Sequence, residues 1–454
     1  MSFTLTFLGA AGTVTGSKYL LTCNESKILI DCGLFQGLKT LRLKNWDDIE
    51  IKASEIQAII LTHAHIDHSG YIPRLIKNGF RGKIYCTHAT KDLCRILLPD
   101  AGYLMEEEAE YRNRTKRTKH SPALPLYTLK EAEASLNFFE GVNYNQKIQV
   151  DSRISFEFFY AGHILGAASV VISVAGKKIA FSGDIGRLTD EIMNPPVALP
   201  AVNYLVTEST YGNRLHEKTS VKDELAQIIN ETVKRNGVVI IPAFAVGRAQ
   251  TIMYYVWKLL SQNKIPDIPM YLNSPMATNV NELLKKYKTL HKLTPEESVY
   301  ICRVVKYVSS VEDSIALNEK KGPMLIISAS GMLSGGRVLH HLKAFGSDPR
   351  NTIVLAGFQA AGTRGEALQR GAREIKVHGE YIEMRAEVKM LENISAHADY
   401  SEILQWLAQS EMSPEKVFIT HGEPSAADEL RRRITEKFGW NCIVPGQNDK
   451  VVLG

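Results

Sequence analysis

The sequence has few of the features that mark secreted and membrane proteins. Its six cysteines include no CxxC pair and no framework spacing, so reduced thiols in a cytosolic protein are expected. No uninterrupted apolar run approaches the length of a membrane span. No basic segment precedes the first apolar residues, as it would in a secretory signal. These absences predict a cytoplasmic protein that does not bind a membrane.

A large excess of one charge is also missing. The formal net charge of +5, spread over the whole chain, permits a polyanionic substrate without requiring one. The apolar share of 44% and the charged share of 23% are those of an ordinary globular protein. The length of 454 residues exceeds that of a typical single core. It predicts two domains, or one domain with a large insertion.

The order of predicted strands and helices supports the insertion. Short strands with tight turns are expected at both sides of a helical stretch, at 3–8, 18–22, 27–31, 83–86, 154–160, 169–174 and 178–182. The helical stretch is expected to cover 71–77, 89–112 and 128–140. From residue 205 strands and helices alternate, which is typical of parallel βαβ units. The last sixty residues return to strand and loop with two helices, at 401–409 and 426–438.

The most informative segment is Thr62–Gly70, which contains three histidines and an aspartate within six residues. Alternate side chains of an extended chain share a face, so His63 and His65 can reach one metal ion. Asp67 and His68, past the bend, reach toward a second. Imidazole nitrogen combined with carboxylate oxygen suits zinc and similar cations. The segment therefore predicts a dinuclear metal site.

Two metal ions need more ligands than one loop supplies, and three candidates follow other predicted strands. His163 lies between two glycines that allow the backbone to approach a site closely. Asp184 follows the strand at 178–182, where its carboxylate could bridge two cations. His421 follows an apolar segment near the C-terminus.

The complete set of these residues resembles the metallo-β-lactamase superfamily in motif order: Asp31, His63-x-His65-x-Asp67-His68, His163, Asp184 and His421. The resemblance implies an αββα sandwich that holds two zinc ions in the loops at its strand ends. It implies one ion on His63, His65 and His163. It implies the other on Asp67, His68 and His421. Asp184 would bridge the two ions, and Asp31 would orient the site from behind the ligands.

The middle block narrows the resemblance to β-CASP ribonucleases related to the cleavage and polyadenylation specificity endonuclease. Glu208 lies in the first motif of this branch, His397 in the second and His421 in the third. Histidine at the third motif is typical of RNA-directed members. The implied organisation is a metallo-β-lactamase domain formed by 1–208 and 386–454, interrupted by a parallel-sheet α/β β-CASP insert at 209–385.

The function that the resemblance implies is zinc-dependent hydrolysis of RNA. A hydroxide activated by two metal ions would attack the phosphodiester and leave 5′-phosphate and 3′-hydroxyl ends. His397 would protonate the leaving oxygen, and Glu208 would hold its orientation and raise its pKa. Asp67 and Asp31 complete the expected catalytic set. RNA is the expected partner, and a homodimer is one assembly that stays open.

Four residues of the middle block are predicted to contact the substrate. Ser330 and Gly331 lie in a turn between a predicted strand and a predicted helix, where backbone N–H groups favour a phosphate. Arg364 lies in a similar glycine-flanked turn. Arg248 opens a predicted helix and either touches the substrate or pairs with an acid. Ordinary turns with capping serines are the alternative for these segments.

Other functions remain open at this stage. A small-ester or thiolester hydrolase would use the same metal ligands but would need neither Glu208, nor His397, nor the insert. A DNA-directed nuclease would share the whole site. A non-enzymatic RNA-binding subunit would be expected to lack ligands, and this chain has every one. Endonucleolytic or 5′-exonucleolytic action, and zinc or manganese as the metal in the cell, are not decided by the sequence.

Overall fold

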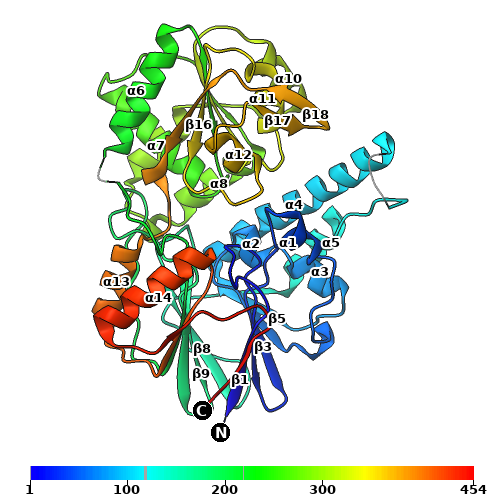
Figure 1. Cartoon of the computed structure of the whole chain (residues 1–454), viewed down its shortest axis with the longest axis vertical. Helices are drawn as coiled ribbons and strands as arrows, with labels where there is room; N and C mark the ends of the chain where they lie inside the picture. Colours follow the sequence, from blue (N-terminus) through cyan, green and yellow to red (C-terminus); the bar gives the residue numbers. More distant parts are fainter. Residues whose placement is uncertain (1, 117–119, 218) are drawn as a thin grey trace. The chain divides into compact units, whose positions relative to one another are not determined.

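The computed structural model describes residues 2–116, 120–217 and 219–454. The chain forms two compact units, Met1–Leu215 with His397–Gly454, and His216–Ala396. The second unit is inserted into the first, which contains both termini (Figure 1). The predicted domain limits at 208 and 386 stay a prediction. Strand β19 (Glu387–Leu391), which lies beyond the second limit, pairs within the sheet of the inserted unit.

The first unit contains two seven-stranded sheets. The order of the first is β22-β1-β2-β3-β4-β5-β6, with β1 (Phe3–Phe7), β2 (Tyr19–Cys23), β3 (Ser26–Ile30), β4 (Ala58–Ile60), β5 (Lys83–Thr87), β6 (Phe139–Val142) and β22 (Lys450–Leu453). The order of the second is β21-β20-β11-β10-β9-β8-β7, with β7 (Ile148–Gln149), β8 (Ile154–Tyr160), β9 (Ala168–Val174), β10 (Lys177–Phe181), β11 (Tyr204–Thr207), β20 (Lys416–Ile419) and β21 (Cys442–Ile443).

Aromatic side chains from both sheets form the core between them. The rings of Phe7 and Phe418 lie 5.2 Å apart, and those of Tyr19 and Phe181 lie 5.6 Å apart. All four side chains are buried. Pairs of this kind contribute about 0.5–1.5 kcal/mol each beyond the burial of their area. The two sheets are therefore joined by a continuous apolar layer.

Helices cover the outer faces of this sandwich (Figure 1). Helices α13 (Tyr400–Gln409) and α14 (Pro424–Phe438) pack Trp406 and Leu430 into an apolar cluster with the second sheet. Helix α4 (His88–Thr115) packs against β5 and β6 of the first sheet. The expected αββα sandwich is confirmed. The described residues include no helix with both the length and the hydropathy of a membrane span.

The inserted unit contains a six-stranded sheet of order β14-β13-β15-β12-β16-β19 in which every pairing is parallel. Its other strands are β12 (Val238–Pro242), β13 (Met270–Asn273), β14 (Lys306–Tyr307), β15 (Met324–Ser328) and β16 (Thr352–Ala356). Its helices are α6 (Val221–Lys234), α7 (Arg248–Ser261), α8 (Pro275–Lys286), α9 (Pro295–Arg303), α10 (Val311–Glu319), α11 (Val338–Phe345) and α12 (Arg364–Gln369). The expected parallel α/β insert is confirmed.

The helix predicted for 128–140 is wrong at its C-terminal end. Helix α5 (Leu129–Ser135) begins at a capping box formed by Thr128 and Glu131. After one 3₁₀ turn the chain extends, and Phe139 pairs with Ile84 as the first residue of β6. The edge position next to β5 offers backbone partners that a longer helix would forgo.

Candidate metal centre

The loops that follow four strands of the sandwich carry the candidate ligands. His63 follows β4, His163 follows β8, Asp184 follows β10 and His421 follows β20. Strands β11 and β20 pair in parallel with Thr207 opposite Ile419. Glu208 and His421, which are far apart in sequence, therefore leave the same edge of one sheet.

Helix α2 (Ile66–Ser69) supplies the bend predicted within the histidine cluster. The chain is extended up to His65, the N-cap of this helix, and then turns. Two other site residues hold the left-handed backbone conformation, Asp31 with φ 56° and His421 with φ 48°. Such conformations are uncommon without glycine and are maintained by surrounding contacts. His421 is held by its N–H, which donates to the carbonyl of Ala10 at 2.7 Å.

One set of donor atoms comes from three histidines and one carboxylate. His65 Nδ1 lies 3.2 Å from His63 Nε2 and 3.2 Å from His163 Nε2. Asp184 Oδ2 lies 3.3 Å from His63 Nε2 and 3.5 Å from His163 Nε2. Tetrahedral ligands with bonds of about 2.1 Å are about 3.4 Å apart. The spacing of these four atoms therefore fits a single tetrahedral cation.

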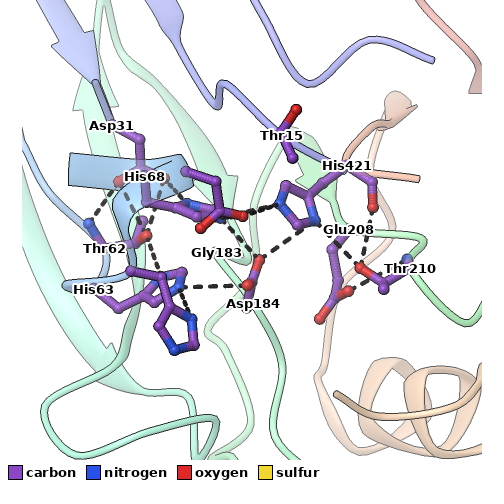
Figure 2. Close-up of polar contacts among 12 residues, drawn as sticks. Thr15, Asp31, Thr62, His63, His68, Gly183, Asp184, Glu208, Thr210 and His421 are labelled. Atoms are coloured by element: carbon purple, nitrogen blue, oxygen red, sulfur yellow. Dashed lines mark hydrogen bonds and ion pairs between the residues drawn. The ribbon is translucent and has the colours of Figure 1, made fainter. Parts of the chain in front are cut away.

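The other carboxyl oxygen of Asp184 faces a second donor set. Asp184 Oδ1 is 3.2 Å from His68 Nε2, which is 3.1 Å from His421 Nε2. Asp67 Oδ2 lies 3.5 Å from His421 Nε2 and 3.9 Å from His68 Nε2. Asp184 Oδ1 is buried and accepts no hydrogen bond. In Figure 2 Asp184 lies between His63 and His421, as expected for a ligand shared by two cations.

Burial sets the protonation of the first donor set. It lowers the pKa of His63 and His163, and that of His65 to about 3. Neutral imidazole is the form that binds a metal ion. Burial opposes the ionised form of Asp184, but His421 and His68 outweigh it and hold the pKa of that carboxyl well below its usual range. The first donor set thus combines neutral nitrogen donors with a carboxylate.

A shell of oxygen atoms fixes the opposite side of the imidazole rings. Asp31 Oδ2 lies 2.8 Å from His68 Nδ1, and its other oxygen accepts the N–H of Thr62 at 2.8 Å. The Thr62 hydroxyl is 3.1 Å from His63 Nδ1. Partners on Nδ1 leave Nε2 for a cation. Asp31 therefore lies behind His68, and its role in orienting the site stays a prediction.

Thr210 contacts His421 in the way that Thr62 contacts His63, through its hydroxyl and the Nδ1 atom of the ring. The sequence alone did not single out Thr210. Its hydroxyl lies 3.2 Å from His421 Nδ1 and donates to the His421 carbonyl at 3.2 Å. The signal that could have identified both threonines is position: Thr62 adjoins His63, and Thr210 follows Glu208 by two residues.

Thr210→Val is expected to weaken metal binding about 10–100-fold, because partners behind a ligand tune its affinity by that amount. Valine keeps the shape of the side chain and removes the hydroxyl. Competition with a chelator of known affinity measures the change. Thr251→Val is the matched control, since that hydroxyl donates to a helix carbonyl in the inserted unit. Equal metal affinity in both variants would show that Thr210 does not orient His421.

Glu208, which is buried, and His397, which is half-buried, form a pair beside Asp184. His397 Nδ1 lies 3.0 Å from Glu208 Oε2, and its Nε2 lies 4.0 Å from Asp184 Oδ2. Burial opposes the charged ring, but the carboxylates of Glu208 and Asp184 outweigh it and raise the pKa of His397 to about 9. Glu208 also accepts the N–H of Ile185 at 2.6 Å. The pair is thus anchored to the loop that carries Asp184.

The four predicted substrate contacts lie in the inserted unit, and their role stays a prediction. Arg248 is buried and donates to the carbonyl of Ala356 at 3.0 Å. Arg364 donates to the carbonyl of Leu333 at 2.9 Å. The described contacts of both arginines therefore lie within their own unit.

Ser330 and Gly331 are likewise engaged within that unit. The Ser330 hydroxyl accepts the N–H of Ser334 at 3.0 Å. A Cβ atom on Gly331 would lie 2.9 Å from the ring of Phe244, so close packing requires glycine there. The metal-donor cluster consists of sandwich residues.

Comparison with known families covers most of the chain. Residues 20–206 match the metallo-beta-lactamase superfamily domain, residues 249–368 match the Beta-Casp domain, and residues 377–445 match the Zn-dependent metallo-hydrolase RNA specificity domain. A crystal structure of a protein of unknown function from Enterococcus faecalis covers 100% of both chains with a TM-score of 0.55 and 15% identity, which shows a shared fold.

Curated relatives match over nearly the whole sequence. Ribonuclease TTHA0252 of Thermus thermophilus is 35% identical, over 91% of this chain and 92% of the relative. RNase J-like protein of Methanocaldococcus jannaschii is 32% identical, over 92% of each chain. Transcription termination factor FttA of Methanosarcina mazei is 32% identical, over 96% of this chain and 69% of the relative. The chain therefore belongs to the β-CASP family of the metallo-β-lactamase superfamily and is a metal-dependent hydrolase.

Proposed function

We propose that this chain is a zinc-dependent ribonuclease that hydrolyses RNA phosphodiester bonds and leaves 5′-phosphate and 3′-hydroxyl ends. The observation that carries the proposal is the sharing of Asp184 by two donor sets, with His397 4.0 Å from the same carboxylate. Two of the relatives are named as ribonucleases, and the match at 377–445 is to an RNA specificity domain.

Two zinc ions per chain are the cofactors that suit these donors. Mixed imidazole and carboxylate sets of four atoms are typical of zinc. His63, His65 and His163 would hold one ion, and Asp67, His68 and His421 the other, with Asp184 shared. When bound, the ions would lower the pKa of a water molecule and offset negative charge on the phosphate oxygens.

The protein itself supplies the proton for the leaving group. Attack of a water oxygen on phosphorus forms one P–O bond, and the bond from phosphorus to the 3′-oxygen breaks. His397 Nε2 gives its proton to that 3′-oxygen, while Glu208 holds the ring through Nδ1. The proton of the attacking water leaves to solvent. The products carry a 5′-phosphate and a 3′-hydroxyl.

The Glu208–His397 pair favours phosphodiester hydrolysis over thiolester hydrolysis. A thiolate leaves without a proton, so a thiolester hydrolase has no use for a positioned acid. A DNA nuclease would use the same pair, and only substrate competition separates it. Binding of RNA as the substrate is part of the proposed function. A homodimer and a cytoplasmic location stay predictions.

The test compares three substrates on protein of measured metal content: end-labelled RNA, the matched DNA strand and a small thiolester. RNA is expected to be cut so that the products carry 5′-phosphate ends. Exhaustive chelation is expected to lower the rate of cleavage by at least about 10³-fold. Zinc added back should restore it. Rapid thiolester turnover without RNA cleavage would contradict the proposal, and preferential cutting of DNA would reassign the substrate.

A further inference from the structure

We infer that Glu402 is a positioning residue that holds the His397 segment against the loop following Asp184. The inference rests on the proposed function, because it gives a role to the side chain that supports the proton donor. Glu402 lies in the first turn of α13 and belongs to no motif of the sequence. Its side chain is only 12% exposed.

The first function of Glu402 is to begin helix α13. Its N–H donates to Asp399 Oδ1 at 3.0 Å, and the N–H of Asp399 donates back to Glu402 Oε2 at 3.1 Å. This reciprocal capping box fixes the chain at Asp399, two residues after His397. The helix start is thereby tied to the segment that carries the proposed acid.

The second function involves a different part of the chain. Glu402 Oε1 accepts the N–H of Leu188 at 3.1 Å, and Arg187 Nε lies 3.5 Å from Oε2. Leu188 and Arg187 belong to the loop that follows Asp184. A single carboxylate thus joins the segment after a metal donor to the segment after the proposed acid.

The contacts between these two segments show what the junction controls. The N–H of Ala398 donates to the carbonyl of Ile185 at 2.8 Å, and Gly186 forms an isolated β-bridge with His397. A Cβ atom on Gly186 would lie 2.1 Å from the backbone of Gly162, so this strand-like contact has no free space behind it. Loss of Glu402 would loosen this backbone contact between the two segments. His397 could then shift relative to Asp184.

A matched control exists in the same unit. Glu131 forms the equivalent capping box in α5, where its side chain accepts the N–H of Thr128 at 2.8 Å. It pairs with Lys77 on the surface at 2.8 Å and bonds to none of the described site residues. Glu131→Ala and Glu402→Ala therefore remove the same type of cap, and only one of them removes a tie to the site.

The experiment measures both variants in the full chain on RNA and on bis(4-nitrophenyl) phosphate, whose phenolate leaves without a proton. Glu402→Ala is expected to lower kcat on RNA about 10–100-fold, because small misplacements of a catalytic group have effects of this size. KM, metal content and the rate on the aryl diester should change by less than about threefold, as expected when only proton transfer is affected. Glu131→Ala should leave kcat on RNA, KM, metal content and the rate on the aryl diester unchanged. It should lower Tm by about as much as Glu402→Ala does.

Three further measurements complete the test. In a His397→Ala background, Glu402→Ala should add no further loss, since the two changes act on one step. Glu402→Gln can accept only one of the two backbone hydrogen bonds, so its kcat on RNA should be intermediate. This variant keeps the inference testable if Glu402→Ala does not fold. Equal kcat on RNA for Glu402→Ala and Glu131→Ala, or equal losses on both substrates, would overturn the inference.

Failure of the proposed function gives a different result. In that case neither wild type nor Glu131→Ala cuts RNA. Crystal structures of wild type and Glu402→Ala then decide the inference on geometry alone. A His397 ring displaced from Glu208 supports it, and an unchanged contact between them overturns it.

Discussion

Asp184→Ala is expected to abolish RNA cleavage, with kcat lowered by at least about 10³-fold. The reason is that both oxygens of this carboxylate face donor nitrogens, at 3.3 Å from His63 and 3.2 Å from His68. Alanine removes one oxygen donor from each set at once. The histidine nitrogens of both sets are then left close together without the carboxylate between them. Metal analysis of the purified variant should show less than the two ions per chain proposed for wild type.

The exposed residue Asp267 supplies the control, since Asp267→Ala removes a carboxylate from the surface of the inserted unit. It should retain both metal ions and full activity. Asp184→Asn keeps the volume and loses the charge, so intermediate metal content is expected. Full RNA cleavage by Asp184→Ala with bound metal would exclude a mechanism in which this carboxylate is shared.

His397→Ala is expected to lower kcat on RNA by about 10²–10⁴-fold, the usual contribution of a general acid. Because His397 is outside the two donor sets, metal content should stay at its wild-type value. The rate on bis(4-nitrophenyl) phosphate should fall far less, since its leaving group needs no proton. The two substrates measured side by side therefore separate proton donation from metal chemistry.

His340→Ala is a suitable comparison, since His340 is an exposed histidine of α11 whose ring packs on His378. It should behave as wild type on both substrates. Near-normal RNA cleavage by His397→Ala would remove the acid from the mechanism and leave the metal centre in place. A parallel loss on both substrates would instead assign His397 a role in holding the site together.

The histidine cluster could be identified from the sequence because its candidate ligands lie within six residues of one another. His163, Asp184 and His421 required the further expectation that strand ends meet at one edge, and their positions agree with it. Thr210 and Glu402 could not be identified in this way. The place of Thr210 next to Glu208 is a hint, but only the folded chain shows which atoms a supporting hydroxyl or carboxylate contacts.

The fold, too, could be predicted from the sequence only in part. Alternating strands and helices are sufficient to predict a parallel sheet in the insert. The order of strands within each sheet depends on which apolar faces pack together, and this is not contained in local periodicity. The end of α5 illustrates the same limit, since pairing of Phe139 with Ile84 overrides a helix-compatible segment.

The pairing of β11 with β20 has a consequence for synthesis of the chain. These adjacent strands are separated by the entire inserted unit, and β22 pairs with β1 from the opposite end of the sequence. Long-range pairings of this kind form late in folding. A ribosome-bound chain therefore carries the histidine cluster well before it carries His421. Both proposed donor sets are therefore complete only after nearly all of the chain has been translated.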